Sequence, residues 1–338
     1  MKALHVVSSR SAADCPGELR LLAMRAPATN TVCILGSAHP DWPAQSANVE
    51  TLCWRHWLDV AALWRLRRLI QCLGPDMICA WGVDALRAVR LAVPRHRATL
   101  ALRDSRTYAR RRPAAWDRKW LAAADIFLAA NQADAERFRS LGVPSDRIRL
   151  VPHAVEVGAD HAESEGTHIV CIGPLEPDYG FYQAIWTFDI LQYADNETEL
   201  VIVGEGSQRR RLENFARRTT CRKRISFRQP AATDAALAQA SVVWVPSLAD
   251  CGAAAALRAM ARSRPVVSSC WPGLAEIVCD NDTGFLVTPG EPMALARRTR
   301  RLLDDPALRR QMGAAGYRRA QQQFSGDALL AAWQRAVA

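Results

Sequence analysis

Short apolar segments alternate along the first half of the chain with longer segments in which apolar residues recur at helical spacing. The segments that predict strands are Leu4–Ser8, Val32–Leu35, Met77–Trp81, Thr99–Leu102, Ile126–Ala129 and Ile148–Val151. Between two of these, one side of a predicted helix carries Leu63, Leu66, Ile70 and Leu73. Strand–helix alternation at this spacing predicts an α/β fold with a parallel, doubly wound sheet.

The second half shows the same alternation after a polar segment. Strands are predicted at Ile169–Ile172, Leu200–Val203, Val242–Val245 and Pro265–Ser268. The segment Glu156–Gly166 before them is polar and acidic, which is the composition of an exposed linker. We therefore expect two doubly wound domains, at 1–156 and 167–325.

A turn of small residues joins the strand Val242–Val245 to an alanine-rich helix. In open α/β sheets, ligands bind where the carboxyl end of a strand meets the amino end of a helix. The unpaired N–H groups and the helix dipole at such a turn favour anions. One hypothesis is therefore a phosphate-bearing substrate, and the other is an ordinary βαβ unit without a ligand.

Length and composition narrow the class of protein. A chain of 338 residues can form two domains with their own cores. It contains no run of ~18 apolar residues, and its first apolar segment is too short for a signal peptide. Its ten cysteines form no Cys-x-x-Cys pair and no Cys/His metal spacing, which is typical of reduced thiols. We expect a cytoplasmic protein without a metal site.

The chain carries a formal net charge of +10, supplied almost entirely by arginine. The densest basic run is Arg103–Lys119, with Tyr108, Trp116 and Trp120 among the cations. One interpretation is a contact with anionic phospholipids, at the inner face of a membrane, or with a phosphorylated acceptor. The other is a solvated loop and helix face. No nucleic-acid-binding module is visible, so no nucleic-acid partner is expected.

Several separated short motifs in the second half occur in a fixed order and spacing. They are Pro246-Ser247, Met260-Ala261, Pro265-Val266-Val267, Glu276-Ile277-Val278, Thr283-Gly284, Pro289-Gly290-Glu291-Pro292, Leu303-Asp304-Asp305-Pro306 and Met312-Gly313. Together they resemble the donor-site region of retaining glycosyltransferase family 4.

The resemblance implies the GT-B fold, in which two Rossmann-like domains face a cleft, the first on the acceptor side and the second binding the donor. It implies a hexosyltransferase that uses a nucleotide-sugar donor and an unknown acceptor, with no cofactor and no metal. It also implies that the helix over 326–338, which contains Leu329, Leu330 and Trp333, crosses back to the first domain.

The family carries two glutamates eight positions apart across the donor turn, and the matching positions here are Asp250 and Arg258. The resemblance implies that Asp250 acts near the sugar as the catalytic carboxylate. Arg258 has five donors and no acceptor, so it cannot accept hydrogen bonds from ribose hydroxyls, but it could bind a phosphate as a fork. The implied donor-binding residues are Gly204, Gly206, Ser247, Cys251, Gly252, Ala253, Ala254 and Arg258. No base is paired with Cys251, which argues against a nucleophile there.

Charged donor contacts of the family are substituted in this chain. Pro174 and Tyr179 stand where active members carry an arginine and a lysine, and Glu176 and Asp178 add negative charge. Either Arg209–Arg211 or Arg222–Arg224 could supply the lost charge. Two hypotheses follow, a glycosyltransferase and a catalytically degenerate relative that acts as a binding or scaffold protein. Another two-domain sugar-nucleotide enzyme, such as an epimerase, is a third.

The first half departs further from the family. Only Gly17 could serve in the glycine-rich loop after the first strand, and Arg103-Asp104 occupies the place of a histidine that lies beside the acceptor. His153 could be a catalytic base or an interdomain polar residue, and the sequence leaves both open.

Overall fold

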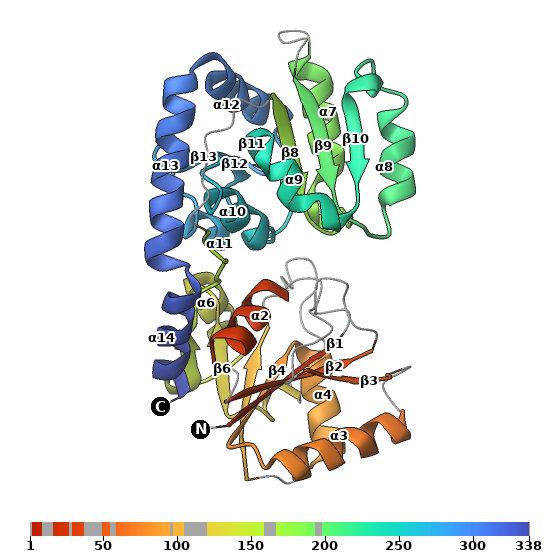
Figure 1. The fold of residues 1–338 in the computed structure, drawn as a ribbon, viewed down its shortest axis with the longest axis vertical. Helices are drawn as coiled ribbons and strands as arrows, with labels where there is room; N and C mark the ends of the chain where they lie inside the picture. The colour runs from red at the N-terminus through yellow and green to blue at the C-terminus, as the bar shows by residue number, and fades with distance from the viewer. Residues whose placement is uncertain are drawn as a thin grey trace. The chain divides into compact units, whose positions relative to one another are not determined.

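The computed structural model describes residues 2–8, 16–26, 29–36, 49–54, 59–94, 97–104, 120–158, 167–192 and 198–337. The chain divides into two compact units (Figure 1). Unit 1 comprises the described residues of 1–154 and 326–338, and unit 2 those of 155–325.

Unit 1 is built on a seven-stranded sheet in the order β3-β2-β1-β4-β5-β6-β7, and every pair of neighbours is parallel. The strands are β1 Ala3–Ser8, β2 Asn30–Leu35, β3 Val49–Leu52, β4 Met77–Trp81, β5 Thr99–Arg103, β6 Ile126–Ala129 and β7 Ile148–Leu150. The strand order reverses between β1 and β4, which is the switch point where such sheets bind ligands.

Helices cover both faces of this sheet. They are α2 Pro16–Arg25, α3 Val60–Leu73, α4 Val83–Ala92, α6 Gln132–Ser140 and α14 Gly326–Val337. Side chains of α3, α4 and α6 pack on one face, while those of α2 and α14 pack on the other. The predicted helix is confirmed as α3, which begins after the capping side chain of Asp59 and ends at Gly74 in the left-handed conformation (φ 52°).

Unit 2 is built on a six-stranded, fully parallel sheet in the order β10-β9-β8-β11-β12-β13. The strands are β8 His168–Ile172, β9 Glu199–Val203, β10 Ile225–Arg228, β11 Ala240–Val245, β12 Val266–Ser269 and β13 Gly284–Val287. The helices are α7 Phe181–Leu191, α8 Arg209–Ala216, α9 Thr233–Ala238, α10 Ala253–Met260, α11 Pro272–Ala275, α12 Pro292–Asp304 and α13 Pro306–Gln323.

Apolar side chains fill both faces of the second sheet. One core lies beneath α7, α8 and α12, and the other beneath α9, α10, α11 and α13. Both units therefore have the predicted doubly wound α/β architecture. The strands β3, β10 and β13, which the sequence analysis did not predict, all lie at edges of their sheets.

Two further observations concern the described residues only. None of their helices combines the length and the hydropathy needed to cross a bilayer. Their nine cysteines are all free thiols, and burial raises the pKa of Cys33 and of Cys79 to about 12. The predicted cytoplasmic location stays a prediction.

Candidate functional site

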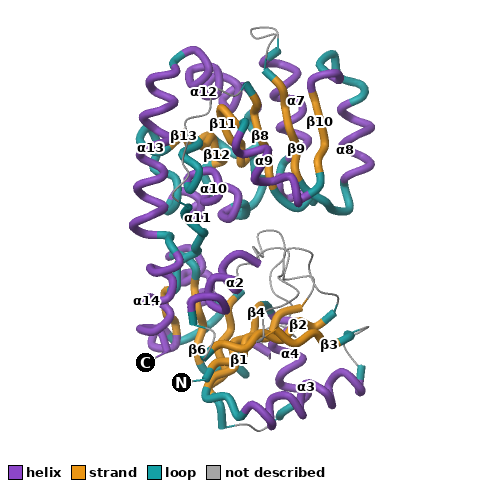
Figure 2. Tube along the Cα trace, viewed as in Figure 1, coloured by secondary structure: helices purple, strands orange, loops and turns teal. Residues whose placement is uncertain are grey.

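The loops that carry the predicted donor residues follow the carboxyl ends of β8, β9, β11 and β12 in unit 2. Because the strands are parallel, these loops meet at one edge of the sheet. Figure 2 shows the segments that follow the strands of this unit in teal.

The Gly-x-Gly turn after β9 is packed directly against the loop after β8. A methyl group at Gly204 would lie 1.9 Å from the carbonyl oxygen of Gly173, and one at Gly206 would lie 2.6 Å from that of Leu175. The backbone N–H of Leu175 donates a hydrogen bond to Glu205 O at 2.8 Å. Glycine is therefore required at 204 and 206 by backbone contact within the protein. Their role toward a donor stays a prediction.

The carboxylate of Glu176, in the loop after β8, is hydrogen-bonded to another residue of the protein. Its carboxylate accepts hydrogen bonds from the backbone N–H and the hydroxyl of Ser207, at 2.7 and 2.6 Å. The ring of Tyr179 lies against Gly173 and stacks on Phe181, with 6.4 Å between the ring centroids. An aromatic stack thus occupies the position at which the family carries a lysine.

The two arginine clusters that could replace the lost charge lie at opposite ends of the strands of this sheet. Arg209 donates to Gly204 O at 3.0 Å, at the carboxyl end of β9, and pairs with Glu213. Arg224 donates to Thr198 O at 3.1 Å, at the amino end of the same strand. Of the two clusters, the one with Arg209 therefore lies at the carboxyl ends of the strands, where sheets of this kind bind ligands.

The turn after β11 is fixed by hydrogen bonds on both sides. The hydroxyl of Ser247 donates to Cys251 O at 2.8 Å, and the thiol of Cys251 lies 3.5 Å from Asp178 O. Asp178 O also accepts from Leu248 N at 2.8 Å, which ties the turn to the β8 loop. Gly252 ends the turn at φ 97°, where a side chain would collide with Val245.

Asp250 connects this turn to the loop after β12. Its Oδ2 accepts a hydrogen bond from Gly273 N at 2.8 Å, in the first turn of α11. Beside it, the indole N–H of Trp271 donates to Ser247 O at 3.0 Å. The carboxylate is half-buried at the edge where ligands bind, and one of its oxygens is held in a fixed position.

Helix α10 begins immediately behind the turn. Gly252 precedes it and provides no side-chain cap for the first N–H groups, which include those of Ala253 and Ala254. Arg258 lies farther along the same helix and is half-buried. Within the described residues, its guanidinium forms no hydrogen bond or ion pair, so its five donors remain available to a ligand.

A buried charged network that the sequence analysis missed lies at the carboxyl edge of the unit 1 sheet. Arg103 donates to Glu18 Oε2 at 2.6 Å and to Val151 O at 2.6 Å, and its guanidinium stacks over Trp81. The other oxygen of Glu18 pairs with His153 Nδ1. Burial alone would raise the pKa of Glu18, but the positive charges and hydrogen bonds of Arg103 and His153 outweigh it and lower the pKa to about 2.

This network corrects one expectation about the basic run Arg103–Lys119. Arg103 is 2% exposed and belongs to the core rather than to a solvated face. Residues 105–119 lie outside the described residues, as do residues 9–15 of the loop before Gly17, so the membrane and acceptor hypotheses stay predictions. The described residues contain no group of three or more His, Cys, Asp or Glu side chains that could hold a metal ion.

Two family models match the chain one after the other. The model "Glycosyltransferase Family 4" matches residues 29–158, and the model "Glycosyl transferases group 1" matches residues 159–319. The chain belongs to the family 4 glycosyltransferases. The resemblance inferred from the motifs is thereby confirmed.

Curated relatives carry the names of several transferases. The chain is 31% identical to D-inositol 3-phosphate glycosyltransferase of Xylanimonas cellulosilytica over 236 residues, which cover 63% of this chain and 56% of that protein. It is 25% identical to the lipopolysaccharide core biosynthesis glycosyltransferase LpsD of Rhizobium meliloti over 273 residues, which cover 80% and 77%. The match thus spans about half of the length of the first of these relatives.

Solved structures of family members share the fold. Anabaena Alr3699/HepE in complex with UDP and glucose has a TM-score of 0.84 at 18% identity, with 100% of this chain and 99% of that chain covered. Sucrose-phosphate synthase of Thermosynechococcus elongatus has a TM-score of 0.78 at 18% identity, with 100% and 98% covered. The two Rossmann-like units are therefore those of the GT-B fold.

Proposed function

We propose that the chain transfers a sugar from a nucleotide-sugar donor to an acceptor, and that the donor binds at the carboxyl edge of the unit 2 sheet. The observation that carries the proposal is the pairing of two features at one turn. The first N–H groups of α10 lack a capping side chain, and Arg258 on the same helix has no ion partner among the described residues. Both features favour a phosphate.

In this proposal the diphosphate binds at the first turn of α10, between Ala253 and the β11 turn. Arg258 supplies charge that Pro174 and Tyr179 cannot, while Arg209 lies beside the same loops but already pairs with Glu213. A charge-assisted hydrogen bond to phosphate contributes about 1.5–3 kcal/mol, so Arg258 compensates for part of the two missing cations. The solved complexes of Anabaena HepE with UDP and with UDP-glucose support a nucleotide-sugar donor.

The proposed transfer depends on the charges that develop on the sugar and on the leaving diphosphate during the reaction. As the bond between the anomeric carbon and the diphosphate breaks, an acceptor hydroxyl forms the new bond to that carbon and its proton passes to a phosphate oxygen. The leaving diphosphate gains negative charge, which the α10 terminus and Arg258 stabilise in place. Asp250, fixed by Gly273, faces the positive charge that develops on the sugar.

The test is calorimetric titration of the purified chain with a panel of nucleotide sugars, followed by donor turnover. We expect binding of at least one donor, weakened about ten-fold in Arg258→Gln because one charge-assisted contact is lost. Arg262→Gln is the matched control, since Arg262 follows the same helix but pairs with Asp234 at 2.9 Å. Absence of heat and of a melting shift with every donor would rule the proposal out.

A triple variant separates transfer from mere binding. Arg258→Glu with Pro174→Arg and Tyr179→Lys restores the residues that the family carries at these positions. If the parent binds donors without turnover and the triple variant hydrolyses them, the chain is a degenerate relative that binds donors. If the parent turns donors over and the triple variant does not improve on it, the arginine site is functional as it stands.

A further inference from the structure

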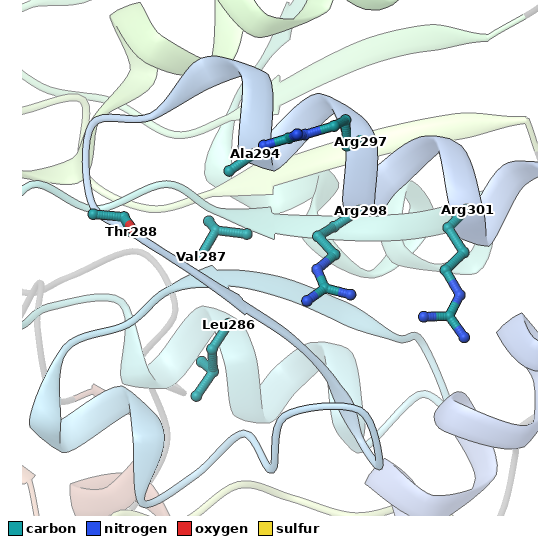
Figure 3. A pocket seen from close by; sticks show the side chains of 7 residues that line it. All are labelled: Leu286, Val287, Thr288, Ala294, Arg297, Arg298 and Arg301. Atoms are coloured by element: carbon teal, nitrogen blue, oxygen red, sulfur yellow. The ribbon is translucent and has the colours of Figure 1, made fainter.

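Unit 2 contains a second candidate binding site. A cavity of about 450 Å³ lies between β13 and α12 (Figure 3). Its volume falls in the roughly 300–1,000 Å³ range of small-molecule sites. The apolar lining comes from Leu286, Val287 and Ala294, and the polar lining from Thr288 and three arginines of α12, which are Arg297, Arg298 and Arg301. None of these residues belongs to the proposed donor site.

Two of the arginines are positioned by one aromatic ring. The guanidinium carbons of Arg298 and Arg301 lie 4.7 and 5.4 Å from the centroid of the Phe285 ring, which is fully buried. Figure 3 shows the two side chains extending from α12 in the same direction. The ring attracts each cation, but it also brings two like charges into the same small region. An anion between them would relieve that repulsion.

The positive charge of this cluster is not compensated within the described residues. Arg297, Arg298 and Arg301 form no ion pair there, whereas Arg300, on the same helix, pairs with Asp304 at 2.7 Å. Arg297 and Arg301 are four residues apart, a spacing at which like charges destabilise a helix. The helix therefore concentrates three uncompensated cations beside one cavity.

The backbone of α12 that presents these arginines is held in place. Thr299, which is fully buried, accepts a hydrogen bond from the indole N–H of Trp244 at 2.7 Å and donates to Leu295 O at 2.8 Å. The helix thus cannot rotate about its axis without breaking a buried hydrogen bond. The arginine positions are set before a ligand arrives, which lowers the entropic cost of binding.

We propose that this cavity binds a phosphate ester, with the phosphate between Arg298 and Arg301 and the carbon skeleton against Val287 and Ala294. Arginine forks match phosphate oxygens in pairs, and the apolar lining suits the carbon skeleton of the ester. The phosphate could belong to a soluble metabolite or to a lipid headgroup, since the chemistry that recognises it is the same.

The experiment is calorimetric titration with glycerol 3-phosphate, with glycerol as the ligand that lacks the phosphate. We expect heat from glycerol 3-phosphate alone, and affinity reduced at least ~10-fold in Arg298→Gln/Arg301→Gln, because two charge-assisted contacts are lost. Arg300→Gln is the matched control for each single variant, since it removes one charge from the same helix outside the cavity. Its affinity should stay within about two-fold of the parent's.

A second experiment, vesicle sedimentation, distinguishes the two sources of phosphate. Sedimentation with vesicles of phosphatidylglycerol in phosphatidylcholine is compared with phosphatidylcholine alone, for the parent and for the same variants. Vesicle binding that needs both phosphatidylglycerol and the two arginines identifies a lipid headgroup, and binding of the soluble ester alone identifies a metabolite. If the double variant matches the parent with both probes, the proposal is wrong. The two single variants provide the same comparison should the double variant fail to fold.

Discussion

The carboxylate of Asp250 accepts a hydrogen bond from the backbone N–H of Gly273 at 2.8 Å, across 23 positions of sequence. The bond joins the turn after β11 to the first turn of α11. Gly273 is buried, so its N–H group would remain unpaired if the carboxylate were removed. One residue thus combines a structural role with the charge that we propose acts on the sugar.

Substitutions at Asp250 separate these two roles. Asp250→Ala should lower the free energy of unfolding by about 1–3 kcal/mol, because a buried donor loses its acceptor. Asp250→Asn keeps an acceptor oxygen, so its stability should change by less than about 1 kcal/mol while donor turnover falls at least ~10-fold. Both predictions are tested by measuring the thermal melting and the donor turnover of the two variants. Equal turnover in Asp250→Asn and the parent would remove Asp250 from the proposed chemistry.

Two glycines test how tightly the donor loops are packed. Gly180 (φ 71°) and Gly290 (φ 78°) share the left-handed backbone conformation, yet their surroundings differ. A methyl group at Gly180 would lie 1.9 Å from Pro246 O, whereas at Gly290 the nearest atom is 3.8 Å away, on Leu248. Gly290→Ala should cost about 1–2 kcal/mol for the conformation alone.

Gly180→Ala adds a backbone collision to that conformational cost, so we expect at least ~3 kcal/mol of destabilisation or a failure to fold. Chemical unfolding of the two variants side by side is the measurement. Similar stability of both variants would show that the β8 loop can move away from the β11 turn. The donor loops would then be less rigid than their contacts indicate.

The sequence predicted interior strands better than edges. Interior strands such as β1, β4 and β11 are buried along their whole length and appear as continuous apolar runs. The edge strands β3 and β10 contain no fully buried residue and alternate weakly, so their pattern does not stand out from a loop. The edge strand β7 was predicted and the largely buried edge strand β13 was not, so the fold class followed mainly from the interior strands.

The candidate site, too, could be predicted only in part: residues close together in the sequence could be placed, but pairings between distant residues could not. Asp250 and Arg258 could be placed from motif spacing, because both lie within one strand–turn–helix unit. The pairing of Arg103 with Glu18 joins residues 85 positions apart, and that of His153 with Glu18 spans 135. No local pattern reports such pairings. The contact of Arg298 and Arg301 with the Phe285 ring likewise joins a helix to a strand, which no local pattern predicts.

The Glu18 network predicts an acid-sensitive stability. The carboxyl pKa of Glu18 falls from 4.5 to about 2 on folding, so the folded state binds fewer protons than the unfolded state between these values. The stabilisation is complete above pH 4.5, and it is lost as pH falls toward about 2. We expect this group to contribute on the order of 3 kcal/mol to the pH dependence of unfolding.

Glu18→Gln should be less stable than the parent at neutral pH by about 3–5 kcal/mol, because Arg103 is left as a buried charge without its partner. The difference between the two should shrink as pH falls from 4.5 toward 2. Asp84→Asn is the control, since its pair with Arg87 is surface-exposed and contributes at most about 1 kcal/mol. A stability difference that is constant with pH would contradict the network.

The packing of the C-terminal helix α14 predicts that the loss of its buried side chains destabilises unit 1. Leu329 and Trp333 are 2% and 3% exposed and pack into the core formed by α2 and β1, where the Trp333 ring lies 5.0 Å from the ring of His5. Removing a buried tryptophan costs about 3–5 kcal/mol, so Trp333→Ala should destabilise unit 1 strongly. Deletion from Asp327 onward should do so at least as much.

Hydrogen exchange locates this effect, because it reports opening segment by segment. In Trp333→Ala, peptides from β1 and α2 should exchange faster, while those from β9 in unit 2 should be unchanged. Gln334→Ala is the matched control, since the neighbouring Gln334 is exposed and its loss should change stability by less than about 0.5 kcal/mol. Uniformly faster exchange in β1 and β9 would mean that α14 stabilises both units, and unchanged exchange in β1 would mean that its burial contributes little.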